Sequence, residues 1–281
     1  MKKRPAFPAK IDFGSDKAPP QVLLSATKVM TPSNQRGMDK TPKPLVPQNK
    51  PSGLGLDSKA VREKMIDKLI AQGLDDEMVL QALRQVERHR FVDTALVNQA
   101  YEDTSLPIGL GQTISKPNVV ARMISLLRQG RNLLITGKLN RVLEIGTGCG
   151  YQAALLAEVS KEVFSIERLK GLHDKATHNL SQLALQNVHL IFGDGMLGYP
   201  QGAPYSGIIS AAGGDTLPQA WIDQLDIGGR IVAPWAQDGS QSLLVIDKTN
   251  KGIERQILER YSLFRPLCQW PDQRPARLYP G

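Results

Sequence analysis

Long apolar segments and cysteines are both scarce in this chain of 281 residues. Nowhere do about 18 uncharged apolar residues follow one another, which excludes a membrane-spanning helix. The two cysteines, Cys149 and Cys268, are too few for a disulfide framework, and the basic start is not followed by the apolar segment of a secretory signal. We therefore expect a cytoplasmic protein that does not associate with membranes.

Acidic residues are also rare in the first part of the chain. Residues 1–52 contain ten Lys and Arg against three Asp, a net charge of +7, whereas the whole chain carries +8. The same segment holds nine of the 19 prolines, which fix φ and remove backbone donors. We interpret residues 1–56 as a basic, proline-rich, disordered extension, either a solubilising tail or a polybasic arm for nucleic acid or an acidic partner. The remainder, 57–281, has the composition of a single globular domain.

Two amphipathic helices are expected at the start of this domain. Val61, Met65 and Leu69 recur at helical spacing, and Asp75 precedes a second apolar pattern with acidic residues in its first turn. The glycines and the proline of residues 106–111 then predict a loop. That loop ends at Ser115, which we expect to cap the helix that has Pro117 in its first turn. Residues 57–138 thus contribute helices and a substrate or lid loop.

Beyond Lys138, short apolar runs alternate with helical patterns. Helices are expected over 151–159, 169–185 and 217–225. Two final runs, separated by a glycine-containing turn, predict an antiparallel hairpin. This order is typical of an α/β fold with a Rossmann-like, doubly wound, mostly parallel sheet and a C-terminal antiparallel hairpin strand. We assign 139–250 to a cofactor-binding core and 251–281 to a C-terminal strand and tail. The expected strands cover 141–146, 162–167, 187–195, 206–212, 228–235, 242–248 and 255–264.

The turn after the first strand is rich in glycine. It reads Glu144-Ile145-Gly146-Thr147-Gly148-Cys149-Gly150, and glycines at alternate positions let the backbone approach a ligand beyond the carboxyl ends of the strands. Gly148, Gly150 and Ala153 also fit the dinucleotide spacing, with Glu167 about where a ribose-binding acid is expected. The loop alone therefore does not separate a nicotinamide dinucleotide from S-adenosyl-L-methionine.

Acidic residues at three successive strand ends favour S-adenosyl-L-methionine. Glu144 is unfavourable beside a pyrophosphate but suits a ligand that carries an ammonium and a sulfonium group. Glu167, an acceptor only when ionised, can accept from both ribose hydroxyls, and Asp194, followed by Gly195, can accept from an adenine amino group. Each alone is also explained as an ordinary turn carboxylate or helix cap. Their joint occurrence supports the cofactor.

Segments along most of the domain resemble one known family. They include LPIGLGQTIS ahead of the core, then VLEIGTGCGYQAALLA, VFSIERLKGL, NVHLIFGDG and LPQAWIDQLDIGGRIVAP. Together, from about Val61 to Leu267, they are similar to the protein-L-isoaspartate O-methyltransferases, repair enzymes for age-damaged Asn and Asp. The glycine loop is shared by many methyltransferases, whereas LPIGLGQTIS is specific to this family and indicates the substrate class.

The resemblance implies a class I methyltransferase with S-adenosyl-L-methionine as methyl donor. Its acceptor would be the free α-carboxylate of L-isoaspartyl residues in damaged proteins and peptides, and the methyl ester would initiate repair. The family's active-site serine corresponds to Ser115. The cofactor-binding positions that it implies are Gln112, Thr113, Ile114, Glu144, Gly146, Gly148, Gly150, Glu167, Asp194 and Gly195.

The chain departs from the family at the fourth strand. Ser206 stands where the family has an aspartate, and Ala212-Gly213-Gly214 replaces an alanine-proline pair. Two alternatives stay open: a methyltransferase acting on RNA or a small molecule, with the basic arm gripping phosphate, and a non-catalytic homologue that only binds the cofactor.

The expected chemistry needs positioning more than proton transfer. An acceptor carboxylate is already ionised at neutral pH, so no general base is required, and Ser115 would hydrogen-bond the acceptor or orient the loop. We expect Ser115→Ala to lower methyl transfer much more than cofactor affinity. The four histidines lack ligand spacing, so no metal is expected. We expect the protein to be a monomer. We also expect that nucleic acid is not one of its partners.

Overall fold

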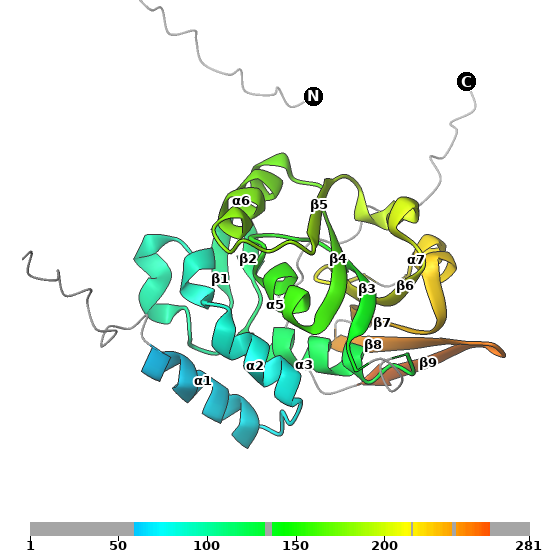
Figure 1. The fold of residues 1–281 in the computed structure, drawn as a ribbon, viewed down its shortest axis with the longest axis horizontal. Helices are drawn as coiled ribbons and strands as arrows, with labels where there is room; N and C mark the ends of the chain where they lie inside the picture. Colours follow the sequence, from blue (N-terminus) through cyan, green and yellow to red (C-terminus); the bar gives the residue numbers. More distant parts are fainter. Residues whose placement is uncertain (1–58, 133–136, 215, 238–239, 259–281) are drawn as a thin grey trace, which may run out of the picture. The chain divides into compact units, whose positions relative to one another are not determined.

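The computed structural model describes residues 59–132, 137–214, 216–237 and 240–258 (Figure 1). The expected N-terminal extension and the C-terminal tail lie outside these ranges. The two expected N-terminal helices are α1 (Lys59–Ala71) and α2 (Glu77–Gln85). The N-cap of α2 is Asp76, whose side chain accepts a hydrogen bond from the backbone N–H of Val79.

A short antiparallel ribbon occupies the segment that we expected to be a loop. Two 3₁₀ helices, η1 (Arg88–Phe91) and η2 (Thr94–Gln99), lead into β1 (Leu106–Gly109), which pairs with β2 (Gln112–Ile114). The strands are too short for an alternating apolar pattern to be recognised, and glycines dominate their turn. Helix α3 (Pro117–Arg128) follows directly, so the ribbon is fixed at both ends to ordered structure.

A seven-stranded sheet in the order β5-β4-β3-β6-β7-β8-β9 forms the centre of the domain. Strands β3 to β7 run parallel to one another, whereas β8 pairs antiparallel with both β7 and β9, which confirms the predicted α/β fold with its C-terminal hairpin. The bounds are β3 (Leu139–Ile145), β4 (Ser160–Glu167), β5 (Val188–Phe192), β6 (Tyr205–Ser210), β7 (Leu225–Gln237), β8 (Ser240–Thr249) and β9 (Gly252–Leu258).

Alternate residues of the central strands pack on opposite faces of the sheet. Val142 and Val232 belong to the larger core, which also contains residues of α1, α2, α3, α5 (Tyr151–Val159) and α6 (Lys170–Ser181). Leu143 belongs to the smaller core beside α7 (Gln219–Gln224). Burial on both faces explains why these strands appear in the sequence as continuous apolar runs. Within the described ranges, no helix is long and apolar enough to cross a bilayer.

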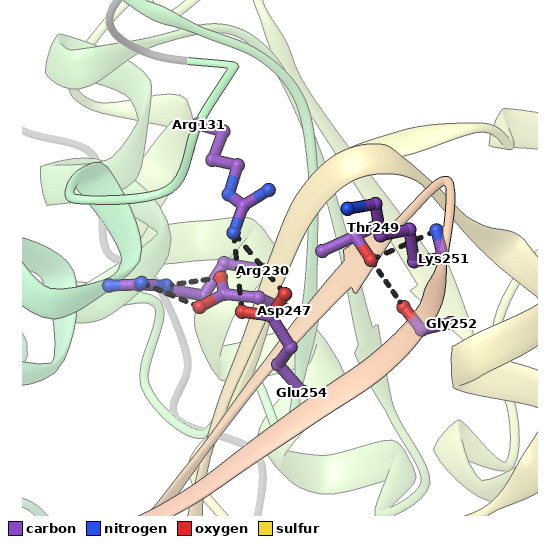
Figure 2. Close-up of polar contacts among 7 residues, drawn as sticks. All are labelled: Arg131, Arg230, Asp247, Thr249, Lys251, Gly252 and Glu254. Carbon is purple, nitrogen blue, oxygen red and sulfur yellow. Dashed lines mark hydrogen bonds and ion pairs between the residues drawn. The ribbon is translucent and has the colours of Figure 1, made fainter.

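Arg230 of β7 pairs with Asp247 of the C-terminal hairpin (Figure 2) and also contacts helix α3. Its Nε and Nη2 donate to the two carboxylate oxygens of Asp247 in β8 at 2.7 and 2.8 Å, and its Nη1 donates to the carbonyl of Leu126 in α3 at 2.9 Å. This bidentate pair is largely buried, whereas Arg131 and Glu254 form a second pair at the surface. The hairpin is therefore tied to the parallel part of the sheet by a fixed polar contact.

Candidate functional site

A cavity of about 310 Å³ lies at the carboxyl ends of β3 and β4 and beside the turn after β5. This edge is where an open α/β sheet is expected to bind its ligand. Ile114, Glu144 and Gly150 are buried and do not line the cavity. The other predicted site residues all line it, namely Gln112, Thr113, Ser115, Gly146, Gly148, Glu167, Asp194 and Gly195.

The backbone N–H groups of the glycine loop are engaged within the protein. Those of Gly146 and Thr147 donate to the carbonyl of Ile166 at 2.9 and 3.2 Å, and that of Gly148 donates to Oε2 of Glu167 at 2.9 Å. A phosphate-binding loop instead presents such N–H groups to the ligand. The geometry therefore disfavours a dinucleotide pyrophosphate at this loop.

Glu167 ends β4 with its carboxylate held by two backbone donors. Besides the Gly148 N–H on Oε2, the Leu169 N–H donates to Oε1, also at 2.9 Å. Each carboxylate oxygen has a further lone pair, and Glu167 lines the cavity, so the group can accept from two neighbouring hydroxyls. This arrangement suits a ribose diol.

The wall of the cavity is more acidic than basic. Asp194 follows β5 and uses Oδ1 to accept from the Met196 N–H at 3.0 Å, while its side chain stays exposed. The charged residues among those that line the cavity are Glu167, Asp194 and Arg168. Such a wall provides acceptors for hydroxyl and amino groups more readily than donors for phosphate.

Two of the predicted site glycines are required by packing. A Cβ at Gly195 would lie 2.5 Å from Cγ2 of Ile145, and a Cβ at Gly150 would lie 3.0 Å from Cγ of Leu180 in α6. Gly150 also has φ +91°, which only glycine adopts without strain. The resemblance assigned both positions to cofactor binding, but their structural surroundings explain them without a ligand.

Glu144 is fully buried in β3 and is linked to the glycine loop by hydrogen bonds through Ser165. Its Oε2 accepts from Oγ of Ser165, which lies 2.6 Å from Oγ1 of Thr147. Burial raises the pKa of Glu144 to about 8; Ser165 and Gln152 oppose this shift, and the charge of Glu167 adds to it. Its direct contact with a cofactor ammonium group stays a prediction, since the side chain does not line the cavity.

The β1–β2 ribbon closes one side of the cavity. Ile108 of β1 lines it, and a Cβ at Gly148 would lie 3.2 Å from Cδ1 of Ile108, so glycine permits the close approach of ribbon and loop. From α6, Lys175 donates to the carbonyl of Ile108 at 2.9 Å and pairs with Asp93 at 2.8 Å. The ribbon is thus held to the helix that follows β4.

Ser115 lies between β2 and α3, half-buried and on the cavity wall. The prediction that it caps α3 is wrong, because the helix begins at Pro117 and its N-cap is Lys116. The Asn118 N–H donates instead to Oδ1 of Asp103 at 3.1 Å. Asp103 thereby satisfies a free N–H of the first turn, and the Ser115 hydroxyl is not needed for that purpose.

Several apolar residues of the wall were missed by the sequence reasoning. Leu169 and Leu172 are three residues apart, the spacing of one helical face, and come shortly after Glu167, a signal that would have placed them near the same ligand. Met196 and Ile108 carry no comparable signal. Trp221 was also missed; it is fully buried, lines the cavity, and donates from Nε1 to the carbonyl of Gly195 at 2.8 Å.

The structure supports neither a metal centre nor a reactive thiol in the described part of the chain. In those ranges, no cluster of three or more His, Cys, Asp or Glu side chains could hold a metal ion. Cys149 is buried beside the glycine loop, and burial raises the pKa of its thiol. It therefore acts as a small packing residue.

The departure at Ser206 lies away from the cavity. At the start of β6, its Oγ accepts from the Asn140 N–H and donates to the carbonyl of Arg141, each at 3.0 Å. The cavity lies at the opposite end of β3 and β6. Of the two departures, only the second contributes to the wall, through Ala212.

Two related sequences each align with 80% or more of this chain. A protein-L-isoaspartate O-methyltransferase of Methylibium petroleiphilum is 51% identical over 274 residues, which span 95% of this chain and 97% of the relative. The enzyme of the same name from Leptothrix cholodnii is 56% identical over 228 residues, 80% of each chain.

Solved structures agree with the sequence matches. A protein-L-isoaspartate O-methyltransferase superposes with a TM-score of 0.62 at 27% identity, covering 73% of this chain and 67% of the other. A Plasmodium falciparum member, solved with S-adenosyl-L-homocysteine, gives a TM-score of 0.61 at 25% identity, covering 72% of this chain and 96% of the other. The family described as protein-L-isoaspartate(D-aspartate) O-methyltransferase matches residues 60–269, and the chain belongs to it.

Proposed function

We propose that this chain transfers a methyl group from S-adenosyl-L-methionine to the free α-carboxylate of L-isoaspartyl residues in damaged proteins and peptides. The resulting methyl ester initiates repair. The observation that carries the proposal is the glycine loop, which donates to Ile166 and Glu167 of its own chain beside a wall with two carboxylates. Family membership and the relative solved with S-adenosyl-L-homocysteine support the acceptor and the cofactor.

The cavity fits the cofactor in its size and in its hydrogen-bond acceptors. Its volume of about 310 Å³ lies at the lower end of the range of small-molecule sites. Glu167 would hold the ribose hydroxyls and Asp194 the adenine amino group, because both side chains retain acceptor capacity beyond their backbone contacts. Gln112 and Thr113, in the β1–β2 ribbon, would contact the cofactor. Glu144 would support the glycine loop through its hydrogen bond with Ser165.

The main contribution of the protein to this reaction is to position the methyl donor and the acceptor carboxylate. When bound, S-adenosyl-L-methionine supplies an electrophilic methyl group on a sulfonium centre. The Ser115 hydroxyl would donate to the acceptor carboxylate, which is ionised at neutral pH and needs no general base. Ile108 and Leu172 would keep water from the reacting atoms. Holding the two reactants in line is enough to account for a large rate enhancement.

A pair of peptides tests the proposal. The protein is incubated with methyl-labelled cofactor and two synthetic peptides that differ only in an isoaspartyl or a normal aspartyl linkage. We expect base-labile methyl ester on the isoaspartyl peptide alone. Labelled RNA would support an RNA methyltransferase instead, and cofactor binding without any transfer would indicate a non-catalytic homologue.

We further propose that the enzyme is a cytoplasmic monomer composed of a basic extension, 1–56, and one methyltransferase domain, 57–281. The scarcity of cysteine and the buried, unpaired thiol of Cys149 support a reducing compartment. Sedimentation equilibrium measures the oligomeric state; a dimer mass at micromolar concentration would contradict the monomer.

A further inference from the structure

Arg88 is a fully buried cation between the segment that carries Ser115 and the helix that follows the glycine loop. It is the first residue of η1 and has 0% exposure. Burial lowers the pKa of its guanidinium because the charged form loses its hydration. An apolar side chain of similar volume would fill the same space at a smaller desolvation cost. The contacts of Arg88 should therefore explain its presence.

The guanidinium donates to two backbone carbonyls from different segments. Its Nε donates to the carbonyl of Ala100 at 2.7 Å, and its Nη2 donates to the carbonyl of Ser115 at 2.8 Å. Ala100 directly follows η2, whereas Ser115 lies on the cavity wall ahead of α3. Because the guanidinium is planar and its donors are fixed relative to one another, it sets the separation of these two segments.

The same guanidinium lies over the ring of Tyr151. Its Cζ is 4.8 Å from the ring centroid, within the range of a cation–π contact. Tyr151 is the first residue of α5, directly after the glycine loop, and Phe91 packs edge-on against it with ring centroids 5.5 Å apart. Arg88 therefore links Ser115 to the start of the helix that the glycine loop precedes.

We propose that Arg88 is a positioning residue for methyl transfer, which sets the Ser115 hydroxyl relative to the glycine loop by holding the Ser115 carbonyl and stacking on Tyr151. The inference rests on the proposed function, in which Ser115 orients the acceptor carboxylate. Arg88 is not among the residues that line the cavity, so it acts through Ser115 and does not touch the substrate. Displacing one of the reacting groups by about 1 Å lowers the rate of a reaction that depends on positioning by about 100-fold.

Arg88→Lys tests the proposal with a conservative change. Lysine keeps the charge but lacks the planar fork that contacts both carbonyls. We expect kcat for an isoaspartyl peptide to fall about 10- to 100-fold, while the Kd of S-adenosylhomocysteine, measured by calorimetry, stays unchanged. The matched control is Arg90→Lys in the same 3₁₀ helix, where Arg90 forms a surface pair with Glu87. The control should alter neither quantity.

A double-mutant cycle distinguishes positioning from a general structural role. If Arg88 acts through the Ser115 hydroxyl, Arg88→Lys should have little further effect on kcat once Ser115→Ala is present. Full and independent losses from both substitutions would overturn the inference. A Ser115→Ala variant with unchanged kcat would overturn it as well, because no hydroxyl would then need to be positioned.

The test does not depend on one variant. If Arg88→Lys fails to fold, Tyr151→Leu replaces the aromatic face with an apolar side chain, and the same loss of kcat and the same non-additivity with Ser115→Ala are expected. Additive losses there overturn the inference. A folded wild type that binds S-adenosylhomocysteine but does not methylate the isoaspartyl peptide contradicts the proposed function, and the inference with it. An active wild type with additive losses contradicts the inference alone.

Discussion

At the scale of single residues, Glu167 must be an acceptor at both oxygens. In Glu167→Gln the amide nitrogen would face the N–H of either Gly148 or Leu169, so one backbone donor would lose its acceptor and the ribose would lose one contact. We expect the Kd of S-adenosylhomocysteine, measured by calorimetry, to rise at least about tenfold, equivalent to about 1.4 kcal/mol. Glu162→Gln, in the same strand but paired with Arg141 at the surface, is the control. Equal Kd values for the two variants would contradict the assigned role.

The buried carboxyl of Glu144 should make stability depend on pH. Its pKa rises from an ordinary 4.5 to about 8 on burial, so between these values the folded protein keeps a proton that the unfolded chain releases. The stabilising contribution of the neutral carboxyl is complete below pH 4.5. It is lost as pH rises through 8, by at most about 1.4 kcal/mol per pH unit.

Glu144→Gln isolates this effect, because glutamine keeps an oxygen acceptor for Ser165 but does not titrate. Urea unfolding of both proteins from pH 5 to pH 8.5 gives the difference in the free energy of unfolding. We expect the wild type to lose stability relative to the variant as the pH rises. A difference that is constant over this range would show that the pKa of Glu144 is not raised.

At the scale of elements, the ribbon depends on Lys175 of α6. Lys175→Met keeps the apolar stem but removes the donor to the Ile108 carbonyl and the pair with Asp93. A lost hydrogen bond of this kind costs about 1 kcal/mol, so we expect the Kd of S-adenosylhomocysteine to rise about fivefold. Amide exchange in residues 106–114 should become faster. The control is Lys170→Met on the same helix, where Lys170 pairs with Asp174 at the surface. Unchanged exchange in the Lys175 variant would show that the ribbon does not need this contact.

The parallel core could be predicted from the sequence because its elements follow local patterns. The continuous apolar runs and the helical spacing of 151–159 depend on neighbouring residues alone, and the structure reproduces them. The ribbon was missed because its pairing shows only as a glycine-rich turn. The cap of α3 was assigned wrongly because the acceptor, Asp103, comes from an earlier segment. The complete burial of the Glu144 side chain also depends on tertiary packing, which no local sequence pattern indicates.

At the scale of the whole molecule, charge and binding are separated along the chain. Most of the net charge of +8 belongs to residues 1–52, whereas the residues that line the cavity lie between Ile108 and Trp221. The family match also begins only at residue 60. The described residues that line the cavity therefore all lie outside the basic extension, and the contribution of the extension to acceptor binding can be measured separately.

Removal of residues 1–56 provides that measurement. For a short isoaspartyl peptide we expect kcat/KM to stay within about twofold of the full chain, since the described residues that line the cavity all belong to the part of the chain that remains. Raising the salt concentration from 50 to 200 mM should change the activity of both forms to the same extent, because the peptide carries no row of phosphates that the basic extension could bind. The cofactor Kd of each form serves as the control for folding. If the deletion abolished transfer while leaving this Kd unchanged, and if activity of the full chain fell steeply with salt, acceptor recognition would depend on the charge of the basic extension, and this prediction would be wrong.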